Sequence, residues 1–329
     1  MDEVLAENLR LDKLPATSWV GLDFGQYHIQ KMLGEGSFSW VYEGHNTETN
    51  QLVAFKVAKP RAQVGKHTSG GTIVFPTRAL IQVTGAYSDA AIDAADLMQQ
   101  QVMTLKSAAH PNLLRVDAFT SNQLITFYQC EFVDGENLRS LMNNGSANIS
   151  HLLAVAQTMA DLQTQKQFVH CDLKPENVMF SSQGIKIIDP GFMGTLTADS
   201  QRRLYVTTPS YYPLLVPNDL LAFGIMSWEI MTGEHPLSAG FSSDMLAPDA
   251  PISAQLLQQV KRLEMGYNYF ASPLLNLKRP SNIKANISTE LDNLLLKLLG
   301  LRIDEKGLLA STDVFSGFSQ IAQVLAKYI

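Results

Sequence analysis

Alternating apolar and polar residues fill much of the first part of the chain, and this pattern predicts strands. The turn-rich segment Asn46–Asn50 between two of them predicts a hairpin. Residues 90–108 instead repeat apolar positions at helical spacing, with Asp93 and Asp96 near the start, where the helix dipole favours acidic side chains. We therefore expect a five-stranded sheet and one helix. The predicted strands are residues 27–33, 37–43, 52–57, 113–119 and 124–132.

The rest of the chain has mainly helical spacing, interrupted by two short strands at 178–180 and 185–188. A small β-rich part followed by a larger helical part predicts an α+β fold with two lobes and a cleft near residue 134. The predicted helices are residues 149–165, 220–231, 254–263, 289–299 and 314–328. The expected organisation is an extension over 1–22, a first lobe over 23–133 and a second lobe over 134–329. The first lobe is expected to contain an insertion at about 58–95, which adds a strand or two within 72–84.

The composition narrows the class of protein. A hydrophobic share of 46% and a charged share of 17% are those of a globular chain. The net charge of −6 excludes a typical nucleic-acid binder, which needs a surplus of cations against phosphate. We see no apolar run long enough for a membrane span and no signal peptide. With only Cys130 and Cys171, no disulfide framework is available, so we expect a soluble protein of the reducing cytoplasm.

Two glycines lie between two predicted strands in Leu33-Gly-Glu-Gly-Ser-Phe-Ser-Trp-Val-Tyr42. Backbone without side chains can close over a phosphate chain and direct its N–H groups at the oxygens. Glycine-rich hairpins are common, so this loop alone is a weak signal. The next strand adds Lys56, in Val53-Ala-Phe-Lys-Val57, as a cation for the non-leaving phosphates. The loop and the lysine together predict a nucleotide site.

A polar segment, His170-Cys-Asp-Leu-Lys-Pro-Glu-Asn177, follows a predicted helix and precedes a predicted strand. Here the chain resembles the eukaryotic-type protein kinases, and the bilobal kinase fold, ATP and Mg²⁺ are what this resemblance implies. By the same resemblance, Asp172 would accept the proton of the substrate hydroxyl and Lys174 would screen the γ-phosphate. Asn177 would hold one magnesium. Asp189 would be the second magnesium ligand, in Asp189-Pro-Gly191, where the family has Asp-Phe-Gly.

The resemblance extends over roughly residues 25–235, through 208–211 and Asp219–Gly224. In this register, Cys130–Gly135 corresponds to the hinge between the lobes, with Cys130 as gatekeeper. Adenine would bond the backbone of two hinge residues and lie between three apolar side chains. The nucleotide-binding residues implied in this way are Leu33, Gly34, Gly36, Val41, Ala54, Lys56, Glu131, Val133 and Met179.

Four departures from the family concern regulation and docking. Gln101 stands where the family has a glutamate that pairs with the strand lysine, unless Asp96 takes that role. The amide of Gln101 can hydrogen-bond Lys56 but forms no ion pair with it. We therefore expect Gln101→Glu to leave activity equal or higher. Pro190 replaces a phenylalanine and predicts a less mobile magnesium loop. Cys171 replaces an arginine that pairs with phosphate, so phosphorylation of the activation segment is not the expected switch. The usual Ala-Pro-Glu is absent.

Three functions remain open from the residues. The first is an active Ser/Thr kinase acting on a protein substrate that the sequence does not identify. The second is a pseudokinase that binds nucleotide without turnover, motivated by Gln101 and Pro190. The third is a small-molecule kinase of the aminoglycoside-phosphotransferase type, which generally lacks a lysine at the place of Lys174. Lys174 therefore favours the first function. The oligomeric state is left open.

Overall fold

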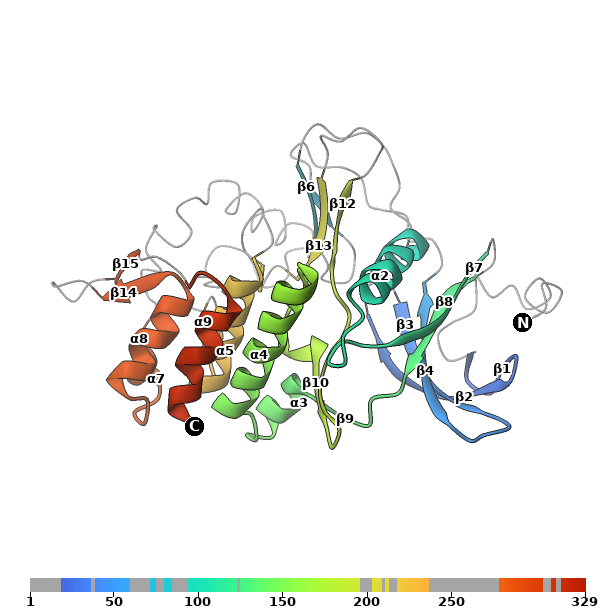
Figure 1. Ribbon diagram of the computed structural model, residues 1–329, viewed down its shortest axis with the longest axis horizontal. Helices are drawn as coiled ribbons and strands as arrows, with labels where there is room; N and C mark the ends of the chain where they lie inside the picture. The colour runs from blue at the N-terminus through green and yellow to red at the C-terminus, as the bar shows by residue number, and fades with distance from the viewer. Residues whose placement is uncertain are drawn as a thin grey trace, which may run out of the picture.

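A computed structural model combines a β-rich part with a helical part, which confirms the predicted α+β fold with a small antiparallel sheet and a larger helical region (Figure 1). In the described part of the chain, no helix is long and apolar enough to cross a membrane. The described residues are 19–36, 39–59, 72–74, 80–84, 94–122, 125–195, 203–208, 211–212, 218–236, 278–303, 309–311 and 315–329.

The main sheet has six antiparallel strands in the order β1-β2-β3-β4-β8-β7. The five predicted strands are present. The sixth, β1, is only two residues long, which is too short to show an alternating pattern. The strands are β1 (Asp23–Phe24), β2 (Tyr27–Glu35), β3 (Ser39–Asn46), β4 (Leu52–Ala58), β7 (Val116–Ser121) and β8 (Thr126–Glu131).

The two faces of this sheet are distinct because successive side chains of a strand point to opposite faces. On one face, Phe55 and its neighbours pack with Trp19 and Phe24 in a separate apolar cluster. On the other face, Ala54 lies opposite Cys130 and Lys56 lies opposite Val41. The second face therefore carries the predicted nucleotide-binding side chains together.

Helix α2 (Ala94–Ala108) contacts strands β4, β7 and β8, and the predicted helical residues 90–93 lie outside the described residues. Its apolar side joins the largest core cluster, which also takes in Ala54 and Cys130 from the sheet. The cluster continues into the helices of the second lobe. One continuous core thus connects the two lobes.

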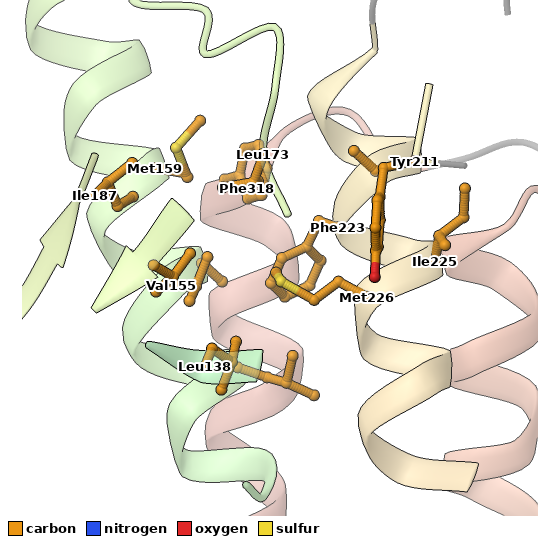
Figure 2. Close-up of a cluster of buried hydrophobic side chains, with 14 of the residues drawn as sticks. Leu138, Val155, Met159, Leu173, Ile187, Tyr211, Phe223, Ile225, Met226 and Phe318 are labelled. Atoms are coloured by element: carbon orange, nitrogen blue, oxygen red, sulfur yellow. The ribbon is translucent and has the colours of Figure 1, made fainter. Parts of the chain in front are cut away.

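The second lobe is built around α4 and α5. Helix α5 is buried on all sides. A Cβ at Gly224 would lie 2.5 Å from the carbonyl oxygen of Leu298, so only glycine at this position lets α8 approach so closely. Figure 2 shows Val155 and Met159 of α4 near Phe223 of α5 and Phe318 of α9. The helices are α3 (Leu138–Asn143), α4 (Ile149–Lys166), α5 (Asp219–Thr232), α7 (Pro280–Ile283), α8 (Thr289–Leu298) and α9 (Phe318–Leu325), with 3₁₀ turns at Pro175–Asn177 and Ala326–Tyr328.

Three smaller sheets complete the fold, and one of them joins distant segments. Strand β6, from the predicted insertion, pairs with β13, which follows Asp189-Pro-Gly191, in the order β12-β13-β6-β5 (Figure 1). The predicted strands within 72–84 are thereby present. The strands are β5 (Thr72–Val74), β6 (Leu80–Thr84), β12 (Phe192–Thr195) and β13 (Arg203–Thr207); β9 (Gly135–Asn137), β10 (Val178–Ser181) and β11 (Gly184–Ile187); and β14 (Leu301–Ile303) and β15 (Leu309–Ser311).

Several predictions fall beyond the described residues. The helix at 254–263 and nearly all of the extension at 1–22 lie there, as does most of the insertion at 58–95. The domain boundaries remain predictions.

Candidate active site

The start of helix α5 anchors the polar loop that follows α4. Asp219 is 4% exposed, and its carboxylate accepts hydrogen bonds from the N–H groups of His170 (2.7 Å) and Cys171 (3.0 Å) and from the hydroxyl of Tyr212 (2.7 Å). The Tyr212 oxygen in turn accepts from the N–H of Leu173 at 2.6 Å. Burial raises the pKa of Tyr212 well above its ordinary value, so the phenol stays a neutral donor. Backbone groups that would otherwise be unpaired in the interior are thus satisfied.

The imidazole of His170 holds the same loop from within. Its Nδ1 accepts from the N–H of Asp172 at 3.2 Å, and its Nε2 lies 2.9 Å from the carbonyl oxygen of Ile188. This pair of partners fits the neutral tautomer with the proton on Nε2. Complete burial lowers the pKa of His170 and favours the same form. Cys171 beside it has φ +62°, a left-handed conformation that costs free energy in a residue other than glycine.

The two oxygens of the Asp172 carboxylate differ in their hydrogen bonds. Oδ2 lies 2.8 Å from Lys174 Nζ and accepts from Asn177 Nδ2 at 3.1 Å. Oδ1 is buried and has no hydrogen-bond partner in the part of the chain described. Lys174 also donates to Thr208 Oγ1 at 2.7 Å. Burial is the largest single effect on Lys174 and opposes its charge, but the carboxylates of Asp172, Glu176 and Asp189 together outweigh it and raise the pKa of the ammonium group. The arrangement orients one oxygen of Asp172 for a further donor.

Asn177 and Asp189 supply oxygen atoms suited to a magnesium ion. The amide nitrogen of Asn177 donates to the carbonyl oxygens of Asp172 (2.8 Å) and Asp189 (3.3 Å), which directs its Oδ1 away from these bonds. Asp189 Oδ1 lies 2.7 Å from Lys56 Nζ. The second oxygen of the same carboxylate, Oδ2, lies beside Oδ1. One carboxylate and one amide oxygen, completed by phosphate and water, match the way Mg²⁺ is held with a nucleotide. The residues present therefore fit this metal.

Lys56 is the point where the sheet, helix α2 and the segment after β11 meet. Its Nζ donates to Gln101 Oε1 at 3.0 Å and pairs with Asp189. Gln101 Nε2 donates to the carbonyl oxygen of Pro190 at 2.9 Å. Asp96, the alternative to Gln101 in the sequence, is exposed in the first turn of α2. The register predicted for Gln101 therefore agrees with its position.

The other predicted nucleotide-binding residues are distributed around this point. Cys130 donates its thiol proton to the carbonyl of Ala54, with sulfur and oxygen 3.6 Å apart, next to the hinge. The N–H of Glu131 donates to Arg115 O at 3.1 Å. Gly36 N–H donates to Ser39 O at 2.8 Å and so closes the glycine hairpin. The placements are Leu33 and Gly34 on β2, Gly36 after it, Val41 on β3, Ala54 on β4, Glu131 at the end of β8, Val133 in the hinge and Met179 on β10.

Comparison with known families decides the relationship. The family model described as "Protein kinase domain" matches residues 87–306, which is more than half of the 329-residue chain. The chain belongs to the protein kinase family. This agrees with the resemblance that the sequence motifs carry and makes the protein a member of a family of phosphate-transferring enzymes.

Relatives within the kinase family are distant. The chain is 26% identical over 230 residues to the probable serine/threonine-protein kinase pknA2 of Bifidobacterium longum, covering 65% of this chain and 27% of that protein. It is 26% identical over 230 residues to the probable kinase PknB of Lactococcus lactis, covering 64% of this chain and 32% of that protein. The chain thus spans about a quarter to a third of the length of these relatives.

Solved kinase structures confirm the bilobal fold. The PknI kinase domain of Mycobacterium tuberculosis matches with a TM-score of 0.53 at 17% identity, over 94% of this chain and 99% of that one. A structure described as the apo form of PpkA-294 matches with a TM-score of 0.57 at 16% identity, over 95% of this chain and 99% of that one. At these identities the likeness concerns the fold alone.

One ionic cluster near the kinase loop was not predicted. Arg139 of α3 pairs with Glu176 of the loop at 2.8 Å and with Glu229 of α5 at 2.6 Å. It also donates to the hydroxyl of Tyr211, which itself donates to Glu229 at 2.5 Å. Such a network ties α3, the loop and α5 together. The acidic residues stand far apart in the sequence, so spacing gave no signal for it.

Both cysteines are buried free thiols. Burial raises the pKa of Cys130 and of Cys171, which keeps the two sulfurs in the unreactive thiol form.

Proposed function

We propose that this protein is an active ATP-dependent kinase that phosphorylates serine or threonine hydroxyls of a protein substrate. The observation that carries the proposal is the carboxylate of Asp172: Lys174 and Asn177 fix one oxygen, while the other is buried and has no hydrogen-bond partner in the described part of the chain. A general base must present a free acceptor atom in a defined direction. Oδ1 of Asp172, which has no hydrogen-bond partner in the described part of the chain, supplies such an acceptor.

The side chains divide the chemistry of the transfer between them. The substrate hydroxyl would donate to Asp172 Oδ1; its oxygen forms the new bond to the γ-phosphorus as the bond to ADP breaks, and the proton passes to Asp172. Lys174 offsets negative charge on the moving phosphoryl group. Lys56 would bind the phosphates that stay on the nucleotide. Mg²⁺, held by Asn177 and Asp189, would neutralise phosphate charge when bound.

The nucleotide would lie against the sheet face that carries Lys56. Ala54 and Val41 lie on this face and Met179 on β10, and we propose that they enclose the adenine ring. The N–H of Glu131 is already bonded to Arg115, so its carbonyl is the group proposed for the adenine edge, together with Val133. Leu33, Gly34 and Gly36 would cover the phosphates.

Two observations support serine and threonine over other acceptors. Lys174 lies 2.8 Å from Asp172, and small-molecule kinases that share the fold generally lack this lysine. The relatives named above carry serine/threonine-protein kinase in their names.

The residue after His170 is a buried cysteine, so a phosphorylated activation segment would find no cation there. We therefore also propose that this segment is not switched by phosphate.

The first prediction tests the catalytic base. Asp172→Asn should lower the transfer of labelled phosphate to the protein itself or to a generic protein substrate by at least about 100-fold, the usual contribution of a general base. Binding of Mg-ATP, followed by thermal shift, should persist because Lys56 and Asp189 are unchanged. Asp161→Asn, an exposed position on α4, is the matched control and should keep wild-type transfer.

The other two functions give different outcomes in the same assay. Wild-type protein that binds Mg-ATP but transfers no phosphate across a broad panel of proteins would identify a pseudokinase. Phosphorylation of aminoglycosides or choline without any protein phosphorylation would identify a small-molecule kinase. Either result contradicts the proposed function.

A further inference from the structure

The side chain of Gln101 makes two different hydrogen bonds at the junction of the lobes. Its oxygen accepts from Lys56 Nζ at 3.0 Å, and its nitrogen donates to the carbonyl oxygen of Pro190 at 2.9 Å. The side chain is partly buried in the middle of the site, and the hydroxyl of Tyr128 lies 3.4 Å from the same oxygen. Gln101 therefore joins helix α2 to both the strand lysine and the proposed magnesium loop.

Only a group with both a donor and an acceptor can make this pair of contacts. A carboxamide has both, whereas an ionised carboxylate has acceptors only. Glutamate at position 101 would satisfy Lys56 but would bring a carboxylate oxygen against the carbonyl oxygen of Pro190. Proline has no N–H that could serve such a carboxylate in return. The carbonyl oxygen of residue 190 thus favours a carboxamide over a carboxylate at position 101, and proline at 190 offers such a carboxylate no N–H of its own.

The loop that Gln101 contacts is held in one conformation on both sides of Pro190. Asp189 has φ +51°, a strained conformation that surrounding contacts must maintain. The N–H of Gly191 donates to the carbonyl oxygen of His170 at 2.7 Å. Pro190 is buried, and the hydrogen bond from Gln101 to its carbonyl oxygen connects the loop to helix α2. Loss of this bond would leave the ion pair between Lys56 and Asp189 without its second attachment from the first lobe, the one that α2 supplies to the residue after Asp189.

We propose that Gln101 is a positioning residue matched to Pro190, and that it sets Lys56 and Asp189 at the spacing that Mg-ATP requires. The proposal rests on the kinase function proposed above and gives a role to two residues that depart from the family pattern. Gln101 and Pro190 are a compensating pair in this chain. Among the described residues, the titratable groups that contact Gln101 are Lys56 from β4 and Tyr128 from β8, and Asp189 pairs with Lys56 beside them.

This reverses the expectation drawn from the sequence, where Gln101→Glu leaves activity equal or higher. That expectation considered only the contact with Lys56. With the contact to Pro190 included, Gln101→Glu should lower kcat/KM for ATP about tenfold, the change expected when one neutral hydrogen bond is replaced by a repulsive contact. Most of the loss should appear in KM for ATP, because Lys56 and Asp189 hold nucleotide and metal.

The decisive experiment is a double-mutant cycle with Pro190→Ala, which restores an N–H to the loop without adding volume. The loss caused by Gln101→Glu should shrink to about threefold or less in the Pro190→Ala background, because the carboxylate now has a donor nearby. Gln100→Glu makes the same chemical change on the exposed neighbouring position of α2 and should leave kcat/KM at the wild-type value. An equal loss in both backgrounds would overturn the pairing of Gln101 with Pro190.

Two further measurements keep the test decisive. If Pro190→Ala does not fold, Gln101→Glu alone still decides, because activity equal to or above wild type contradicts the proposal. If the wild-type protein transfers no phosphate, the proposed function fails, and the same cycle is measured as the Kd for Mg-ATP by calorimetry. A Kd that rises with Gln101→Glu only when Pro190 is present would support the positioning role even then; a Kd that does not change would overturn it.

Discussion

The imidazole of His170 is held between two backbone groups, and the contact at Nδ1 requires the neutral ring. Nδ1 accepts a proton from Asp172 N–H, so protonation of Nδ1 would break that bond. Three carboxylates, those of Asp219, Asp172 and Asp189, raise the pKa of His170, but burial is the larger effect and lowers it. The catalytic loop therefore carries a group that resists protonation in the folded state.

A pH dependence of stability follows from the lowered pKa. Because the unfolded chain binds a proton near pH 6.5 and the folded loop does not, the free energy of unfolding should fall by up to about 1.4 kcal/mol per pH unit as the pH drops below about 6.5. Urea unfolding between pH 7.5 and 5.5 measures this slope. His170→Gln should have a shallower slope. Identical slopes would show that His170 does not cause the effect. Burial also lowers the pKa of His151, so a residual slope is expected in the variant.

At the residue scale, the sequence identified the groups that gather but not how each is used. Lys56, Asp172 and Asp189 are found by motif spacing; in the fold Lys56 pairs with Asp189, and Asn177 donates to both Asp172 and Asp189. Their catalytic roles stay predictions. The donor bond from Gln101 and the open oxygen of Asp172 depend on side-chain rotamers and on contacts between segments far apart in the chain. No local pattern reports such contacts, so the role of Gln101 required the structure.

At the scale of elements, the pattern located long elements well and short ones poorly. Helix α4 begins at the predicted residue, where Asn148 caps it with a side-chain bond to Ser150 N–H. Helix α3 was missed because six residues show less than two turns of periodicity. Strands β12 and β13 were missed because their sheet depends on a distant segment: β12 pairs with β13, and β13 pairs with β6, more than a hundred residues earlier in the chain.

The sheet that contains β6 gives a prediction for the segment after Asp189-Pro-Gly191. Strand β6 is an inner strand, paired with β13 on one side and β5 on the other, so its N–H groups serve the ladder. Gln82→Pro removes one of these N–H groups and should raise amide exchange in the strands paired with it, 72–74 and 203–207, by about tenfold, as expected for one lost hydrogen bond. Gln82→Thr keeps the N–H and is the control. Unchanged exchange in the proline variant would show that β6 does not hold this segment.

At the scale of the whole molecule, two apolar clusters share one sheet. Strand β4 contributes Ala54 to the cluster that crosses both lobes and Phe55 to the cluster on the outer face. Since one strand belongs to both, unfolding of the outer cluster removes packing from the larger one. We expect the two lobes to unfold in a single cooperative transition.

The three tryptophans of the chain can test this cooperativity. Trp19 and Trp40 lie in the outer cluster, and Trp228 is fully buried in the larger one. In a Trp228→Phe variant, fluorescence reports the outer cluster; in a variant with Trp19→Phe and Trp40→Phe, it reports the larger cluster. In each variant the fluorescence midpoint in urea should coincide with that of circular dichroism. An earlier fluorescence midpoint in the Trp228→Phe variant would show that the first lobe unfolds by itself.

The pairing of β6 with β13 also constrains how this kinase can be altered or diverge. Two segments that share a hydrogen-bonded ladder must keep matching lengths and registers, such as Leu204 opposite Val83. An activation segment grafted from a relative that lacks the partner strand would leave β6 as an open edge, prone to pair with other chains. Residues 80–84 and 203–207 therefore form one inherited unit, and exchanges between homologues should move both segments together.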